Sequence, residues 1–95
     1  MARPITLRVL TQEGLAFEEQ TSSIIAPGEV GYLGILANHA PLVTTLKPGT
    51  LTWRRPAGSQ AVSWVGAGLL EIAKNRCTIL TSALSEQPPA SASSG

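Results

Sequence analysis

The chain has no aspartate, one histidine and one cysteine among its 95 residues. A Ser-His-Asp triad therefore cannot be assembled from this chain alone. Nothing around Cys77 or His39 favours an activated thiolate, so we expect Cys77 to be a small buried hydrophobic side chain. Metal binding needs several converging ligands, and Glu29, His39 and Cys77 belong to separate segments without ligand spacing. We therefore expect no catalytic residue, no metal site and no enzymatic activity.

Charge and aromatic content are also low. Charged side chains make up 14% of the chain, against roughly 25% in an ordinary soluble domain. Seven basic and six acidic residues give a net charge of +1, and no basic stripe is present to neutralise a run of phosphates. We therefore expect no nucleic-acid partner. The four aromatic residues leave packing to aliphatic side chains, and the low charge fits a surface that neighbouring proteins cover.

Long hydrophobic runs are missing as well. No segment approaches 18 uninterrupted apolar residues, and the first residues lack the apolar core of a signal peptide. We expect no direct membrane insertion, and a soluble or peripheral protein on the cytoplasmic side.

The glycines Gly28, Gly31 and Gly34 form a G-x-x-G-x-x-G run that superficially resembles a phosphate-binding loop. Such loops need a following helix and a lysine or hydroxyl side chain. No helical pattern follows here, and the loop carries Glu29 in place of lysine. The glycines are better explained by tight turns, so we expect no cofactor-binding site.

Alternation of apolar and polar residues predicts strands almost throughout the chain. The strands are expected at residues 5–10, 15–26, 32–36, 41–46, 50–55, 61–65, 69–72 and 76–81. The polar middle of the second strand, residues 18–23, suggests a bulge there. Turns are expected at Pro-Gly and Lys-Asn pairs between strands.

This spacing predicts an all-β fold, a flattened antiparallel β-sandwich or barrel of about 8 to 10 short strands. We place the domain at residues 1–84. Residues 85–95 have low complexity and low hydrophobicity, which predicts a disordered tail.

Residues 26–49, APGEVGYLGILANHAPLVTTLKPG, resemble the most characteristic segment of the F-type ATP synthase epsilon family. A Gly-rich loop, an L-G-I-L strand, an N-H-A-P turn and a strand ending in L-K-P-G follow in the family's order. Residues 65–72 (VGAGLLEI) and 7–18 (LRVLTQEGLAFE) are similar to two further family segments. The resemblance covers residues 5–82. It implies the N-terminal β-sandwich without the family's C-terminal helical hairpin, and a regulatory role associated with that hairpin is not implied.

The resemblance implies a non-catalytic subunit of the central stalk, or rotor, of a proton-translocating ATP synthase. Such a subunit links gamma to the c-ring and couples proton flow to ATP synthesis. It implies partners in gamma, the c-ring and the rest of the complex (alpha and beta). It also implies a peripheral location on the cytoplasmic face of the bacterial inner membrane.

Family placement also assigns contact residues. The implied c-ring contacts are Glu29, Val30, Tyr32 and Leu33. The implied gamma contacts are Thr11, His39 and Thr44. Many family members carry an acidic residue where this chain has Tyr32, and Glu29 is the nearest acidic side chain. We expect Glu29 and Tyr32 to project outward, and His39 to satisfy local backbone groups.

One alternative remains open from the residues alone. A small β-sandwich adaptor that binds a peptide or a small ligand outside the synthase would show the same strand pattern. The two differ in their neighbours, because a synthase subunit should copurify with gamma or c subunits.

Overall fold

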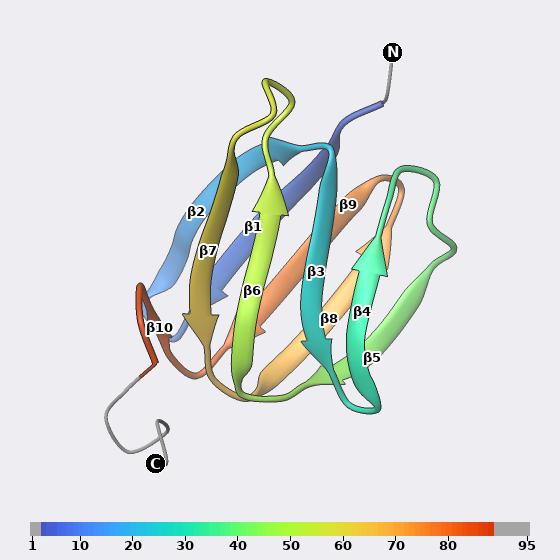
Figure 1. The fold of residues 1–95 in the computed structure, drawn as a ribbon. Coiled ribbons are helices and arrows are strands. Elements are labelled where there is room, and N and C mark those ends of the chain that lie inside the picture. Colours follow the sequence, from blue (N-terminus) through green and yellow to red (C-terminus); the bar gives the residue numbers. More distant parts are fainter. Residues whose placement is uncertain (1–2, 89–95) are drawn as a thin grey trace.

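The computed structural model describes residues 3–88, and this part of the chain forms ten strands and no helix (Figure 1). Their bounds are β1 (Ile5–Thr11), β2 (Gly14–Thr21), β3 (Ser23–Gly28), β4 (Gly31–Ile35), β5 (Leu42–Leu46), β6 (Gly49–Arg54), β7 (Gln60–Val65), β8 (Gly68–Ala73), β9 (Arg76–Thr81) and β10 (Leu84–Ser85). The expected all-β class with eight to ten short strands is confirmed.

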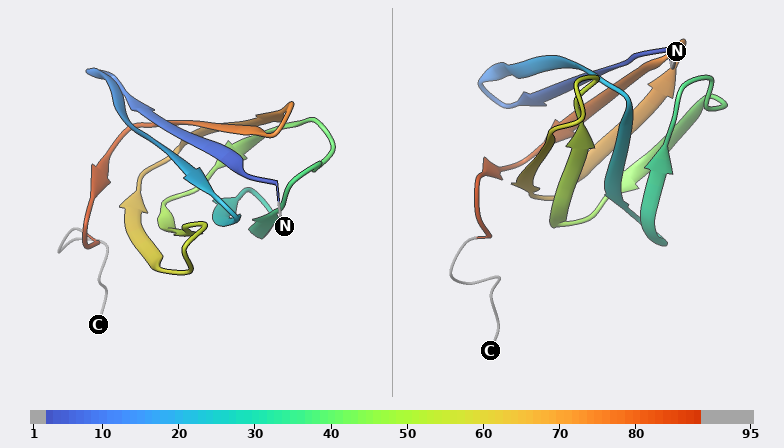
Figure 2. Two further views of the ribbon diagram at one scale, coloured as in Figure 1. Left: turned by 90° about the horizontal axis from the view of Figure 1, so that it is seen from above. Right: turned by 45° about the horizontal axis from the view of Figure 1, so that its top comes forward.

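The strands form one sheet in the order β10-β7-β6-β3-β5-β8-β9-β1-β2, with β4 paired to β3. The sheet curls over itself, so that its β1–β2 part lies across from β6 and β7 (Figure 2). Pairing is antiparallel as expected, with one exception: β1 runs parallel to β9. A long stretch of chain separates these two strands, so their parallel pairing needs no tight turn.

The core lies between the two parts of the curled sheet. Alternate residues of each strand point into it, as the period of two requires. In β1 these are Ile5, Leu7 and Val9, and in β6 they are Leu51 and Trp53. The remaining buried hydrophobic side chains come from six other strands: Ile24, Ala26, Ile35, Leu46, Val65, Leu70, Ile72, Cys77 and Ile79. The predicted face assignment of β1 and β6 is therefore confirmed.

The single strand predicted over residues 15–26 is wrong, because the chain breaks at Ser22 into β2 and β3. The backbone N–H of Ser22 donates to the Arg54 carbonyl at 2.8 Å, and the hydroxyl of buried Thr21 donates to the Ile5 carbonyl at 2.9 Å. β2 pairs with β1, whereas β3 pairs with β6, so the chain crosses between the two parts of the sheet here. The bulge expected in residues 18–23 lies instead at Ala16, where the β1–β2 register shifts.

The last strand, β10, pairs with the end of β7, and the Ser63 hydroxyl donates to the Ser85 carbonyl at 2.9 Å. The predicted boundary after residue 84 therefore falls inside β10. Residues 89–95 of the predicted tail lie outside the described residues, so its disorder stays a prediction.

The turns gather at two opposite ends of the sheet. The β3–β4 turn (residues 29–30) and the β1–β2 turn (residues 12–13) lie at the same end of the sheet, which we call the hairpin end. The strand register shows this, because Gly28 pairs with Leu46, Leu46 with Gly68 and Gly68 with Thr81, and β1 runs parallel to β9. The loop over residues 36–41 lies at the other end. There the Asn38 N–H donates to the Asn75 side-chain oxygen in the β8–β9 turn.

Candidate protein interface

The β3–β4 turn at the hairpin end presents Glu29 and Val30 to solvent. Val30 is fully exposed, and Glu29 is exposed beside it. Gly31 has a φ of +133°, a backbone conformation that only glycine adopts readily. Glu29 therefore projects outward as expected. The positive φ of Gly31 agrees with the interpretation that the glycines of the G-x-x-G-x-x-G run serve tight turns.

Tyr32 and Leu33 continue from this turn into β4 and point to opposite sides. The Tyr32 side chain is exposed, as expected, but its hydroxyl also accepts a hydrogen bond from the Thr50 N–H at 3.2 Å. Leu33 is half-buried and packs against the core. Of the four residues assigned to the c-ring, three face outward and Leu33 faces inward.

The three residues assigned to gamma do not form one cluster. Thr11 ends β1 at the hairpin end, and its hydroxyl oxygen accepts from the Glu13 N–H at 3.2 Å. His39 lies in the loop at the opposite end, where its Nδ1 lies 2.7 Å from the Ala40 carbonyl oxygen. That contact confirms that the ring satisfies local backbone. Thr44 is half-buried and pairs with buried Leu70 on the core side of the sheet.

A row of four leucines crosses the outer face of β2, β1, β9 and β8. The register pairs Leu15 with Leu10, Leu10 with Leu80, and Leu80 with Leu69. We call these four residues the leucine row. Leu15, Leu69 and Leu80 are each about half exposed, at 53%, 51% and 49%, and Leu10 is half-buried. Exposed leucines that adjoin one another across four strands make this face a candidate protein contact surface.

Charged side chains border the leucine row on one side. Arg8 and Glu18 pair across β1 and β2 in the next outward-facing positions, with Nε and Oε1 3.0 Å apart. Their alignment does not meet hydrogen-bond geometry, so the contact is an ion pair only. Glu71 follows in the same line on β8. An apolar centre with a polar rim is the usual anatomy of a protein interface.

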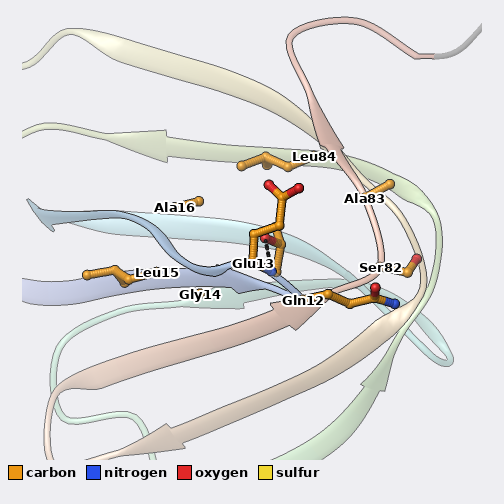
Figure 3. A pocket seen from close by; sticks show the side chains of 9 residues that line it. Gln12, Glu13, Gly14, Leu15, Ala16, Ser82, Ala83 and Leu84 are labelled. Atoms are coloured by element: carbon orange, nitrogen blue, oxygen red, sulfur yellow. Dashed lines mark hydrogen bonds between the residues drawn. The ribbon is translucent and has the colours of Figure 1, made fainter.

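A hollow adjoins the leucine row at the hairpin end. It is lined by Thr11, Gln12, Glu13, Gly14, Leu15, Ala16, Ser82, Ala83 and Leu84. Figure 3 shows the Glu13 side chain extended toward the segment that carries Ala83 and Leu84. The lining contains a carboxylate and neither lysine nor arginine, so it offers no charge that would complement a phosphate.

Sequence reasoning missed the leucine row, although a signal was present. Several strands carry two consecutive apolar residues where a period of two allows one, and three of these pairs are Val9-Leu10, Leu69-Leu70 and Ile79-Leu80. In each of these three pairs one residue is buried and the other belongs to the leucine row.

Two titratable groups have shifted pKa values. The Arg55 guanidinium, by donating to Glu19, lowers the pKa of that carboxyl, and the Trp53 indole N–H adds to the effect, while partial burial opposes it. Burial raises the pKa of the Cys77 thiol to about 12. Such a thiol stays protonated at neutral pH and is a poor nucleophile. Among residues 3–88 no three His, Cys, Asp or Glu side chains gather as metal ligands.

The part of the chain described by the structure contains no helix with the length and apolar character needed to cross a membrane.

Comparison with known proteins identifies the family. Residues 4–87 match the model of the ATP synthase delta/epsilon chain β-sandwich domain. The ATP synthase epsilon chain of Acidithiobacillus ferridurans is 41% identical over 84% of this chain and 56% of its own length. The ATP synthase epsilon chain of Dichelobacter nodosus is 35% identical over 84% of this chain and 56% of its own length. The chain thus spans little more than half the length of these relatives.

Solved structures agree on the fold. A chain in the cryo-EM structure of the Euglena gracilis mitochondrial ATP synthase (OSCP/F1/c-ring) superposes with a TM-score of 0.80 at 23% identity, covering 85% of this chain and 52% of that one. A chain in the cryo-EM structure of the Tetrahymena thermophila mitochondrial ATP synthase (central stalk/c-ring) superposes with a TM-score of 0.72 at 20% identity. The superposition covers 90% of this chain and 68% of that one. Together with the family match, these findings show that the chain belongs to the ATP synthase delta/epsilon family, through its β-sandwich domain.

Proposed function

We propose that the chain is a non-catalytic epsilon subunit in the central stalk of a proton-translocating F-type ATP synthase. It links gamma to the c-ring, and in this way couples proton flow to ATP synthesis. The observation that carries the proposal is the family match over residues 4–87, in relatives that are themselves named epsilon chains. Two separate exposed surfaces, the hairpin end and the leucine row, supply the two contacts that a linking subunit needs.

The leucine row is the proposed gamma surface. Its apolar centre and charged border suit a lasting protein contact, and Thr11 adjoins it through the hollow at the β1–β2 turn. Contact of gamma with His39 requires that gamma also extends over the loop at residues 36–41. Thr44 lies on the core side of β5, so the proposed surface leaves it out of contact with gamma.

The hairpin end is the proposed c-ring surface. Glu29 and Val30 are exposed at the β3–β4 turn, and Tyr32 lies beside them; Leu33 supports the turn from the core side. An exposed carboxylate next to an apolar tip suits the polar loops of a c-ring.

The proposed mechanism is mechanical. The ladder hydrogen bonds and close-packed core of a β-sandwich resist shear, so that the ring and gamma turn together. Catalysis then takes place in alpha and beta subunits of the complex. We further propose a peripheral location on the cytoplasmic face of the bacterial inner membrane, which the bacterial relatives support.

The gamma surface is tested with a double variant, Leu69→Glu with Leu80→Glu, and the matched control Val62→Glu. Val62 is 52% exposed but lies on β7, away from the leucine row. We expect the double variant to lose about 30-fold or more in affinity for gamma, the size of a hot-spot loss of about 2 kcal/mol. The control should bind normally. Equal binding by all three proteins would contradict the proposed surface.

A further inference from the structure

The ladder between β3 and β6 stops early, at Pro27. Ile25 pairs with Thr52, so continuation of the same register would place Pro27 opposite Thr50. The Pro27 carbonyl instead accepts the Lys47 N–H at 2.8 Å, because β3 turns there toward β5. The Thr50 N–H is thereby left without its ladder acceptor on β3.

The Tyr32 hydroxyl takes the place of that acceptor. Tyr32 pairs with Pro27 from the other side, on β4, and its side chain crosses β3 to accept the Thr50 N–H at 3.2 Å. Among the strands of residues 3–88, β4 pairs with β3 alone. The phenol therefore ties this edge strand to the start of β6.

Gly49 provides the space for this contact. A Cβ atom at residue 49 would lie 2.9 Å from the Tyr32 hydroxyl oxygen and 2.9 Å from the Pro27 Cβ. Any side chain there would displace the phenol or the proline ring. The Gly49 position and the Tyr32 position thus depend on each other.

We propose that Tyr32 is a positioning residue. Its hydrogen bond to the Thr50 N–H, the Tyr32 latch, holds the β3–β4 turn in the orientation that docks on the c-ring. The inference rests on the proposed function, and it assigns Tyr32 an indirect role beside the direct contacts of Glu29 and Val30. A turn ordered before docking loses less conformational entropy on binding. The latch thus supports docking without a charge at residue 32.

The latch is tested first in the free protein, by amide hydrogen exchange of Thr50. Tyr32→Phe keeps the ring and removes only the hydroxyl, while Gly49→Ala keeps the hydroxyl and places a methyl group 2.9 Å from both the Tyr32 hydroxyl oxygen and the Pro27 Cβ. Leu36→Ala, an exposed change just beyond the far end of β4, is the control. We expect both test variants to speed Thr50 exchange about fivefold, which corresponds to ~1 kcal/mol. Unchanged exchange in Tyr32→Phe would overturn the latch.

The docking role is tested with ATP synthase particles depleted of this subunit, titrated with each variant. Tyr32→Phe and Gly49→Ala should both weaken docking two- to fivefold, and Leu36→Ala should not. If only Tyr32→Phe weakens docking, the hydroxyl touches the partner directly and the positioning role is wrong. If neither does while Glu29→Gln weakens docking, the proposed function stands and the latch has no part in it. If the wild-type chain fails to dock, the proposed function falls and takes the docking role with it.

Discussion

Phe17 of β2 stacks on Trp53 of β6, with ring centroids 5.1 Å apart and 26° between the ring planes. The two strands are far apart in the sheet order, so this contact forms where the curled sheet closes over itself. The Trp53 indole N–H also donates to Glu19, two residues after Phe17, at 3.2 Å. The closure of the sandwich thus depends on side chains of an edge strand.

Removal of the aromatic stack should destabilise the closed sandwich, and two substitutions of Phe17 should do so to different extents. Phe17→Leu keeps most of the apolar contact and should cost about 1 kcal/mol, the value of an aromatic pair beyond its burial. Phe17→Ala also loses the buried area and should cost about 2 to 3 kcal/mol, less than a fully buried phenylalanine because Phe17 is half-buried. Urea unfolding measures both. If Phe17→Leu were as stable as the wild type, the aromatic stack would contribute nothing to stability.

Glu19 should make the fold sensitive to acid. Its pKa in the folded chain is below the ordinary value of 4.5, chiefly through Arg55. The carboxylate therefore stabilises the fold above pH 4.5, and this contribution is lost as the pH falls through the lower folded pKa. Both partners are partly exposed, so we expect Glu19→Gln to cost under about 1 kcal/mol at pH 7.

Glu19→Gln should also reduce the loss of stability between pH 7 and pH 3, measured by thermal unfolding at each pH. Glu13→Gln, at the exposed β1–β2 turn, is the control and should leave the profile as it is in the wild type. An identical acid profile in the Glu19 variant would contradict the role given to the Arg55 contact.

Cys77 should be unreactive in the folded protein. It is fully buried and its pKa is raised to about 12, so at pH 8 it offers neither access nor thiolate. A thiol reagent should label it only after denaturation. Above pH 9 ionisation of the thiol favours the unfolded chain, so stability should decline as the pH rises toward 12. Rapid labelling of the native protein at pH 8 would contradict the burial of this side chain.

Two glycines should respond very differently to alanine. A Cβ at Gly68 would overlap the Leu80 carbonyl on the neighbouring strand β9, whereas a Cβ at Gly34 would meet nothing within 4 Å. We expect Gly68→Ala to cost about 3 kcal/mol or more, through loss of β8–β9 pairing. Gly34→Ala should change stability by under about 0.5 kcal/mol. Denaturant midpoints compare the two, and similar losses would contradict the strand spacing at Gly68.

The period of two was enough to predict most strands and the core faces of β1 and β6. It failed between residues 15 and 26 because Glu19 and Thr21 point inward although they are polar. Their polarity is satisfied by Arg55, Trp53 and the Ile5 carbonyl, which are at least 16 residues away in the sequence. No local pattern contains those partners.

The residues of the candidate interface were predicted only in part, for a similar reason. Exposure of Glu29 and Tyr32 follows from local turn chemistry, and it is found. The leucine row requires the register between four strands, including the parallel β1–β9 pair, before its members meet. The Tyr32 hydrogen bond likewise depends on where β3 leaves β6, and this is a tertiary feature.

The central claim, that this chain couples the rotor, is tested most directly by proton-driven ATP synthesis in reconstituted vesicles. ATP synthase depleted of its epsilon subunit is assayed alone, with the purified chain, and with the chain carrying Leu69→Glu and Leu80→Glu. We predict that the wild-type chain binds and restores synthesis, and that the double variant does not. Binding of the chain with no gain in synthesis, or no binding at all, would contradict the account.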